Sequence, residues 1–128
     1  MVVALDTNIV VDLLRKKNEA PRKILAYSEL YLPITVCGEL LFGAAISAKP
    51  VESRQDVIQF LEKCKLLDFD LSVAESYAEI RKHLQAKGRP IPENDVWIAA
   101  TAMAYGLKLI TRDQHFSNID FLNVEFWK

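Results

Sequence analysis

Short continuous apolar runs alternate along the chain with longer stretches in which apolar residues are spaced as on one helix face. Val2–Leu5 is such a run and is typical of a strand buried on both faces of a parallel sheet. Between Thr7 and Lys17 the apolar residues instead follow a helical period. Strands alternating with helices predict an α/β fold with a parallel sheet.

The whole pattern predicts five strands and six helices. Strands are expected at 2–5, 30–34, 66–69, 108–111 and 124–127, and helices at 7–17, 20–28, 35–48, 50–63, 72–87 and 95–105. Thr35, Asn94 and a capping box from Ser72 to Glu75 are the expected helix starts, and Gly88 and Gly106 the expected ends. Pro33 marks either an edge strand or the end of a strand.

These elements predict a three-layer α/β/α sandwich with a short central parallel sheet. The segment Val96–Ala104 is apolar nearly all round, so we expect that helix to lie deep against the sheet. No linker, repeat or low-complexity stretch divides the chain, and we expect a single domain over 1–128.

Composition and charge exclude several classes of protein. The chain has 16 basic and 17 acidic residues among 128, a net charge of −1, so it does not coat nucleic acid through bulk positive charge. Cys37 and Cys64 form no CxxC motif, which excludes a zinc frame or disulfide scaffold and predicts buried, reduced thiols. No signal peptide and no apolar run of about 20 residues is present. We therefore expect a cytoplasmic protein without membrane contact.

Most of the carboxylates lie beside Lys or Arg on helix faces and are expected to be solvated. This group comprises Glu52, Asp56, Glu62, Glu75 and Glu79. Four others lie where predicted strands end or helices begin: Asp6, Glu39, Asp95 and Asp113. In a parallel α/β sheet these positions share the edge at which ligands bind. We therefore expect these four carboxylates to converge in space.

Converging carboxylates repel one another, and a divalent cation offsets this repulsion far better than helix dipoles, which contribute only ~0.3–1 kcal/mol each. A cluster of hard oxygen ligands favours Mg²⁺ or Mn²⁺ over Zn²⁺. Such an ion lowers the pKa of bound water and stabilises charge on a phosphate, so phosphodiester hydrolysis is the chemistry this pattern favours.

Polar neighbours of the four carboxylates extend the candidate site. Thr7 and Thr111 adjoin predicted ligands and are expected to orient a carboxylate or water, although Thr7 could equally cap a helix. Asn8 and Asn94 could bond the carboxylates or cap helices, and Arg112 adjoins Asp113. His115 is either a base or a polar loop residue. Further basic residues that could flank a polyanion are Arg15, Lys16, Lys17, Arg22, Lys23, Arg81, Lys82, Lys87 and Arg89.

Four segments together resemble the PIN-domain ribonucleases, specifically the VapC-type toxins of toxin–antitoxin pairs. They are Leu5–Leu14, Ile34–Leu40, Ile91–Ala100 and Leu109–Phe116, in family order. The resemblance implies a Mg²⁺- or Mn²⁺-dependent endoribonuclease, a hydrolase that cleaves tRNA or ribosomal RNA. It implies that Asp6 and Asp95 are the firmest metal ligands and that Glu39 and Asp113 complete the site. It also implies an antitoxin partner that blocks the site, and a homodimer.

Two other hypotheses stay open at the sequence level. A PIN-like module could bind RNA or a partner protein without catalysis. An acidic-pocket phosphatase of the haloacid dehalogenase type is a weaker alternative, because it needs a second Asp at the position of Asn8. The apolar segment Leu40–Ile46 is either core or a partner surface.

Overall fold

A computed structural model, which describes all residues from Met1 to Lys128, contains one five-stranded sheet. Every neighbouring pair of strands is parallel, and the spatial order is β3-β2-β1-β4-β5. The strands are β1 (Val2–Leu5), β2 (Glu29–Pro33), β3 (Lys65–Leu67), β4 (Leu109–Thr111) and β5 (Val124–Phe126). The predicted parallel sheet is therefore confirmed.

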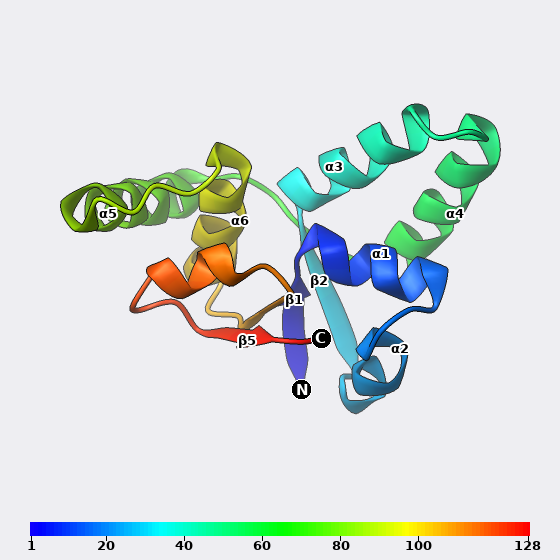
Figure 1. Cartoon of the computed structure of the whole chain (residues 1–128), viewed down its shortest axis with the longest axis horizontal. Coiled ribbons are helices and arrows are strands. Elements are labelled where there is room, and N and C mark those ends of the chain that lie inside the picture. The colour runs from blue at the N-terminus through cyan, green and yellow to red at the C-terminus, as the bar shows by residue number, and fades with distance from the viewer.

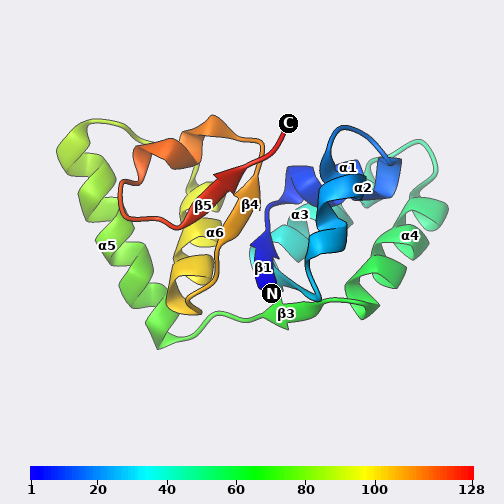
Figure 2. The same ribbon diagram turned by 90° about the horizontal axis from the view of Figure 1, so that it is seen from below.

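Helices cover both faces of this sheet. In Figure 1, α5 and α6 lie to the left of β1 and β2, whereas α1, α3 and α4 lie to the right, and Figure 2 shows the same division from below. The helices are α1 (Thr7–Arg15), α2 (Ala20–Lys23), α3 (Ile34–Ala45), α4 (Pro50–Glu62), α5 (Leu71–Lys87) and α6 (Glu93–Ala104), with short 3₁₀ helices η1 (Ile24–Ala26) and η2 (Gln114–Asn118). This is the predicted three-layer α/β/α sandwich. No helix combines the length and apolar character needed to cross a membrane.

The core is centred on β1, β4 and α6. Val3, Leu5 and Ile110 have no exposed surface, as expected for strands covered on both faces. Ile98 and Ala99 of α6 are equally buried, which confirms that this helix lies deep. Burying one such large aliphatic side chain contributes about 1.5–3 kcal/mol.

The strand order creates a switch point between β1 and β4. The chain builds β1, β2 and β3 in one direction and then adds β4 on the other side of β1. At this junction the backbone N–H of Asp6 donates to the carbonyl oxygen of Ile110 at 2.9 Å. Ligands in open α/β sheets bind beyond the strand carboxyl ends at such a point.

Three predicted helix starts are wrong. Helix α3 begins at Ile34 and α6 at Glu93, each directly after a proline in an extended conformation, so Thr35 and Asn94 lie inside the helices and do not cap them. Helix α5 begins before the expected capping box, because Asp70 accepts a hydrogen bond from Val73 N at 3.0 Å and acts as the cap.

The remaining predictions concern residues 20–28, two turn-forming residues and the cysteines. Residues 20–28 form two short turns, α2 and η1, instead of one helix. Pro33 ends β2, which is not an edge strand, since it pairs with both β1 and β3. Gly88 does end α5, with a positive φ of 66°. Both cysteines are free; Cys37 is buried and Cys64 is half-buried.

Candidate functional site

A cavity of about 310 Å³ lies where β1 and β4 end, and four carboxylates line it. They come from four separate elements: Asp6 follows β1, Glu39 lies on α3, Asp95 in the first turn of α6, and Asp113 after β4. The other lining residues are Thr7, Asn8, Val11 and Arg112. The structure thus brings together all four carboxylates that the sequence analysis selected. A larger cavity of about 390 Å³ between α5 and α6 contains none of them.

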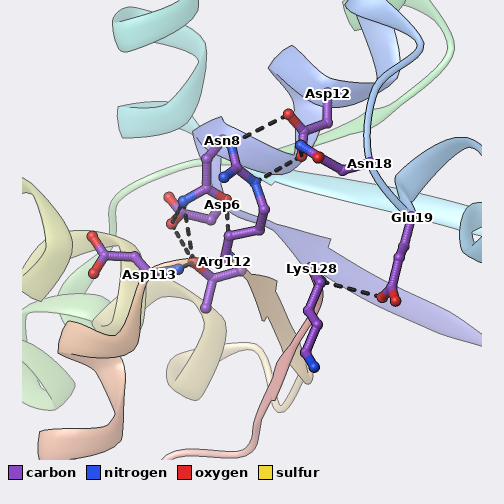
Figure 3. A network of polar contacts seen from close by, with 9 residues as sticks. Asp6, Asn8, Asp12, Asn18, Glu19, Arg112, Asp113 and Lys128 are labelled. Carbon is purple, nitrogen blue, oxygen red and sulfur yellow. Dashed lines mark hydrogen bonds and ion pairs between the residues drawn. The ribbon is translucent and has the colours of Figure 1, made fainter.

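Asp6 is the most enclosed of the four, with 4% of its surface exposed. Its carboxylate caps α1 by accepting from the backbone N–H of Thr7 at 2.8 Å. The hydroxyl of Thr111 donates to the other oxygen at 2.6 Å, and the Asn8 amide donates to it at 3.3 Å. These donors fix the position of the carboxylate, and Figure 3 shows Asn8 beside Asp6.

Glu39 is held by a hydroxyl in the same way. Thr7 Oγ1 donates to Glu39 Oε1 at 2.6 Å, which joins the first turn of α1 to α3. Thr7 and Thr111 therefore each donate to one of the predicted ligands. Thr7 is not the cap of α1, because Asp6 occupies that position.

Asp95, Asp113 and His115 form the tightest group of donor atoms. One candidate ligand atom from each lies within 4.8 Å of the others. His115 Nδ1 is 3.1 Å from Asp113 Oδ1 and 3.5 Å from Asp95 Oδ2. His115 is thus part of the cluster and not only a polar loop residue. It lies two residues after Asp113, on the first turn of η2.

The electrostatics of the cavity oppose ionisation. Burial raises the pKa of Asp6 to about 6, and the negative charges of Asp95 and Glu39 add to this shift. Burial also raises the pKa of Asp95, and repulsion from Asp113 raises it further. Hard oxygen donors that repel one another are the set that a divalent cation would stabilise, so these residues fit such an ion.

Asn8 and Arg112 link the two sides of the cavity. Asn8 Oδ1 accepts from the backbone N–H of Arg112 at 3.1 Å, and the Arg112 side chain extends towards α1 (Figure 3). There it meets Asp12, a buried carboxylate that the sequence analysis did not select. Asp12 follows Ile9 by three residues and therefore lies on the same apolar face of α1. A charged residue on an apolar helix face indicates a buried charge that needs a partner.

Other predicted residues do not join the site. Asn94 is exposed and donates to none of the four carboxylates, because the earlier helix start turns it to solvent. Several basic residues are paired elsewhere: Arg81 with Glu93, Lys87 with Asp120 and Lys23 with Glu19. Arg15 lines a neighbouring groove of about 290 Å³ that also reaches Thr7 and Glu39.

The apolar segment on α3 is divided between core and surface. Leu40 and Ala44 are buried, whereas Phe42 and Ile46 are 65% and 69% exposed. The segment is therefore neither entirely core nor entirely exposed surface. Glu52, Asp56, Glu62, Glu75 and Glu79 are all exposed, as expected for solvated helix faces.

Comparison with known proteins identifies relatives along nearly the whole chain. The family model described as PIN domain matches residues 3–122. The chain is 35% identical over 126 residues to VapC ribonuclease Y4jK of Sinorhizobium fredii, covering 88% of this chain and 87% of that protein. It is 29% identical to the tRNA(fMet)-specific endonuclease VapC of Shigella flexneri, covering 96% of each. The crystal structure of VapBC2 from Rickettsia felis bound to a promoter DNA fragment aligns with a TM-score of 0.90 at 29% identity, over 100% of both chains.

Proposed function

The chain belongs to the PIN-domain family, and from this we propose that it is a metal-dependent endoribonuclease of the VapC type, the toxin of a toxin–antitoxin pair. One observation carries the proposal. Four carboxylates from distant parts of the sequence line a single cavity, and burial and mutual repulsion raise the pKa of two of them. Such a cavity is suited to a hard dication, which can in turn bind a phosphate.

Members of this family generally depend on a divalent metal ion. We propose that Asp6 and Asp95 are the main ligands here, that Glu39 and Asp113 complete the set, and that the ion is Mg²⁺ or Mn²⁺. The oxygen-rich donor set supports this choice. When bound, the ion would supply an acidified water and stabilise charge on the scissile phosphate.

The chain's own residues would prepare that chemistry. Thr111 and the backbone of Thr7 hold the Asp6 carboxylate, and the Thr7 hydroxyl holds Glu39, so the ligands need little reorganisation. Glu39 or Asp113 would orient the attacking water in line with the leaving oxygen. Asn8 ties the loop that carries Arg112 and Asp113 to α1.

The comparisons guide the choice of substrate and partner. We propose tRNA before ribosomal RNA, because one relative is named a tRNA(fMet)-specific endonuclease. We propose an antitoxin partner because the aligned Rickettsia structure is a VapBC complex. A homodimer and a cytoplasmic location complete the proposal.

Cleavage of RNA tests the proposal directly. Purified protein should cleave total bacterial tRNA with Mg²⁺ or Mn²⁺ and lose cleavage in EDTA. Asp6→Asn and Asp95→Ala should abolish cleavage and remain folded, because each removes a repelling charge. Equal RNA degradation by wild type, both variants and the EDTA sample would refute a metal-dependent nuclease. RNA binding without cleavage would favour the non-catalytic module.

A further inference from the structure

Asp12 is a buried carboxylate outside the cluster of four. It lies on α1 with 3% of its surface exposed. A buried carboxylate needs a partner, because loss of hydration penalises an isolated charge. Its partner is Arg112, 100 residues away in sequence, whose Nε lies 2.7 Å from Asp12 Oδ2 and whose Nη2 donates to Oδ1 at 3.3 Å.

The turn that follows α1 also contacts Asp12. Lys16 and Asn18 both have positive φ, 56° and 58°, a conformation that residues other than glycine seldom adopt. The resulting turn carries Asn18 back towards the helix, and its amide donates to Asp12 Oδ2 at 3.0 Å. The main chain closes the same turn, with Lys17 N donating to the carbonyl of Asp12 at 2.9 Å. Contacts other than the one with Arg112 therefore also hold Asp12 in place.

Arg112 has the only cationic side chain among the residues that line the carboxylate cavity. An unrestrained guanidinium at this position would pair with the nearby carboxylates and compete with a metal ion for them. Figure 3 shows that the side chain instead runs towards Asp12, on the side away from the Asp113 carboxylate. Asp12 uses one edge of the guanidinium, and the side chain stays 39% exposed, so other N–H groups can reach a ligand.

We propose that Asp12 is a positioning residue that holds the Arg112 guanidinium off the cluster carboxylates and at the cavity rim, where it binds a phosphate of the substrate backbone. The planar donor fork of arginine matches a phosphate, and a fixed fork loses little freedom on binding. The phosphate contact rests on the proposed ribonuclease function, whereas the effect on the carboxylates does not.

Three variants separate the two parts of the proposal. Asp12→Asn releases the guanidinium onto the carboxylates, and Mn²⁺ affinity should fall about tenfold, which is the lower end of the loss seen when groups around metal ligands are changed. Arg112→Gln removes the competing cation, so Mn²⁺ affinity should not fall, but KM for RNA should rise about tenfold through loss of a charged hydrogen bond. The double variant should regain wild-type Mn²⁺ affinity and keep the raised KM.

The experiment combines Mn²⁺ titration calorimetry with steady-state cleavage of total tRNA, and thermal melting confirms that each variant is folded at the assay temperature. Asp120→Asn is the matched control, because it breaks an exposed ion pair with Lys87 outside the cavity and should leave Mn²⁺ affinity and KM unchanged. If Asp12→Asn does not fold, Asn18→Gly loosens Asp12 more mildly, and it should weaken Mn²⁺ binding in the same direction.

Three results would overturn one part of the proposal or the other. The positioning role is wrong if a folded Asp12→Asn or Asn18→Gly variant binds Mn²⁺ like wild type, or if the double variant stays as weak as Asp12→Asn. The phosphate contact is wrong if Arg112→Gln leaves KM unchanged. If wild type cleaves no tRNA, the ribonuclease proposal fails by itself, and the order of Mn²⁺ affinities still decides the role of Asp12.

Discussion

The buried charge of Asp6 destabilises the folded protein. Its pKa is raised from 3.8 to about 6, chiefly by burial. Because one pKa unit corresponds to about 1.4 kcal/mol, ionised Asp6 opposes folding by about 3 kcal/mol at neutral pH. Between pH 4 and 6 the folded state binds more protons than the unfolded chain, so this penalty grows as pH rises through that window.

Asp6→Asn should therefore stabilise the metal-free protein. In EDTA at pH 7.5 we expect a gain of about 1–2 kcal/mol, less than the full penalty because an amide does not repeat every hydrogen bond of the carboxylate. At pH 4 the gain should largely vanish, since wild-type Asp6 is then protonated. Urea unfolding at the two pH values measures both. A variant that is less stable than wild type at pH 7.5 would contradict the penalty.

Thr111 acts on Asp6 through its hydroxyl. It is fully buried, donates to Asp6, and accepts from the backbone N–H of Asp113 at 2.9 Å. Thr111→Val should cost about 1–3 kcal/mol of stability, because it leaves buried polar groups unpaired. It should also raise the pKa of Asp6 further, so the acid limb of the cleavage profile should move to higher pH. Thr111→Ser, which keeps the hydroxyl, should leave the limb in place.

At the scale of elements, the positions of the strands could be predicted better than the residues that cap the helices. The apolar runs located all five strands to within two residues, and the pattern is clearest for β1 and β4, which are largely buried and have no polar face. The starts of α3 and α6 were missed because Pro33 and Pro92, with ψ of 143° each, set the entry geometry through their backbone. Residue type suggested Thr35 and Asn94, but capping depends on backbone conformation.

The positive φ at the end of α5 makes Gly88 a test of helix termination. Gly88→Ala puts a Cβ on a residue with φ of 66°, so it should cost about 1 kcal/mol although no atom lies within 4 Å of the new carbon. Gly38→Ala is the matched control: it lies inside α3, also in open space, and should stabilise by about 0.5–1 kcal/mol. Thermal melting of both variants checks the opposite signs. Equal changes in melting temperature for the two variants would mean that the positive φ of Gly88 does not disfavour alanine there.

At the scale of the whole molecule, the site depends on which strands are neighbours. The sequence indicated that carboxylates would lie at strand ends, but it does not state that β4 pairs with β1. That pairing places Thr111 against Asp6 and Arg112 against Asp12, contacts that span 105 and 100 residues. Local patterns carry no information on such partners, so the sequence could not pair Arg112 with Asp12 or Thr111 with Asp6.

Folding, protonation and metal binding involve the same carboxylates. We therefore expect the more stable of wild type and Asp6→Asn to differ between EDTA and Mn²⁺. A ligand that binds only the folded state adds about 2.7 kcal/mol at a concentration 100 times its Kd. In saturating Mn²⁺ at pH 7.5, wild type should therefore become more stable than Asp6→Asn, although it is less stable in EDTA. At pH 5 Mn²⁺ should stabilise wild type much less, because protons compete for Asp6, whose pKa is about 6. Melting curves of both proteins in EDTA and in Mn²⁺ at each pH measure this crossing. An unchanged order in Mn²⁺ at pH 7.5 would show that Asp6 is not a ligand, and would leave its raised pKa as a consequence of burial alone.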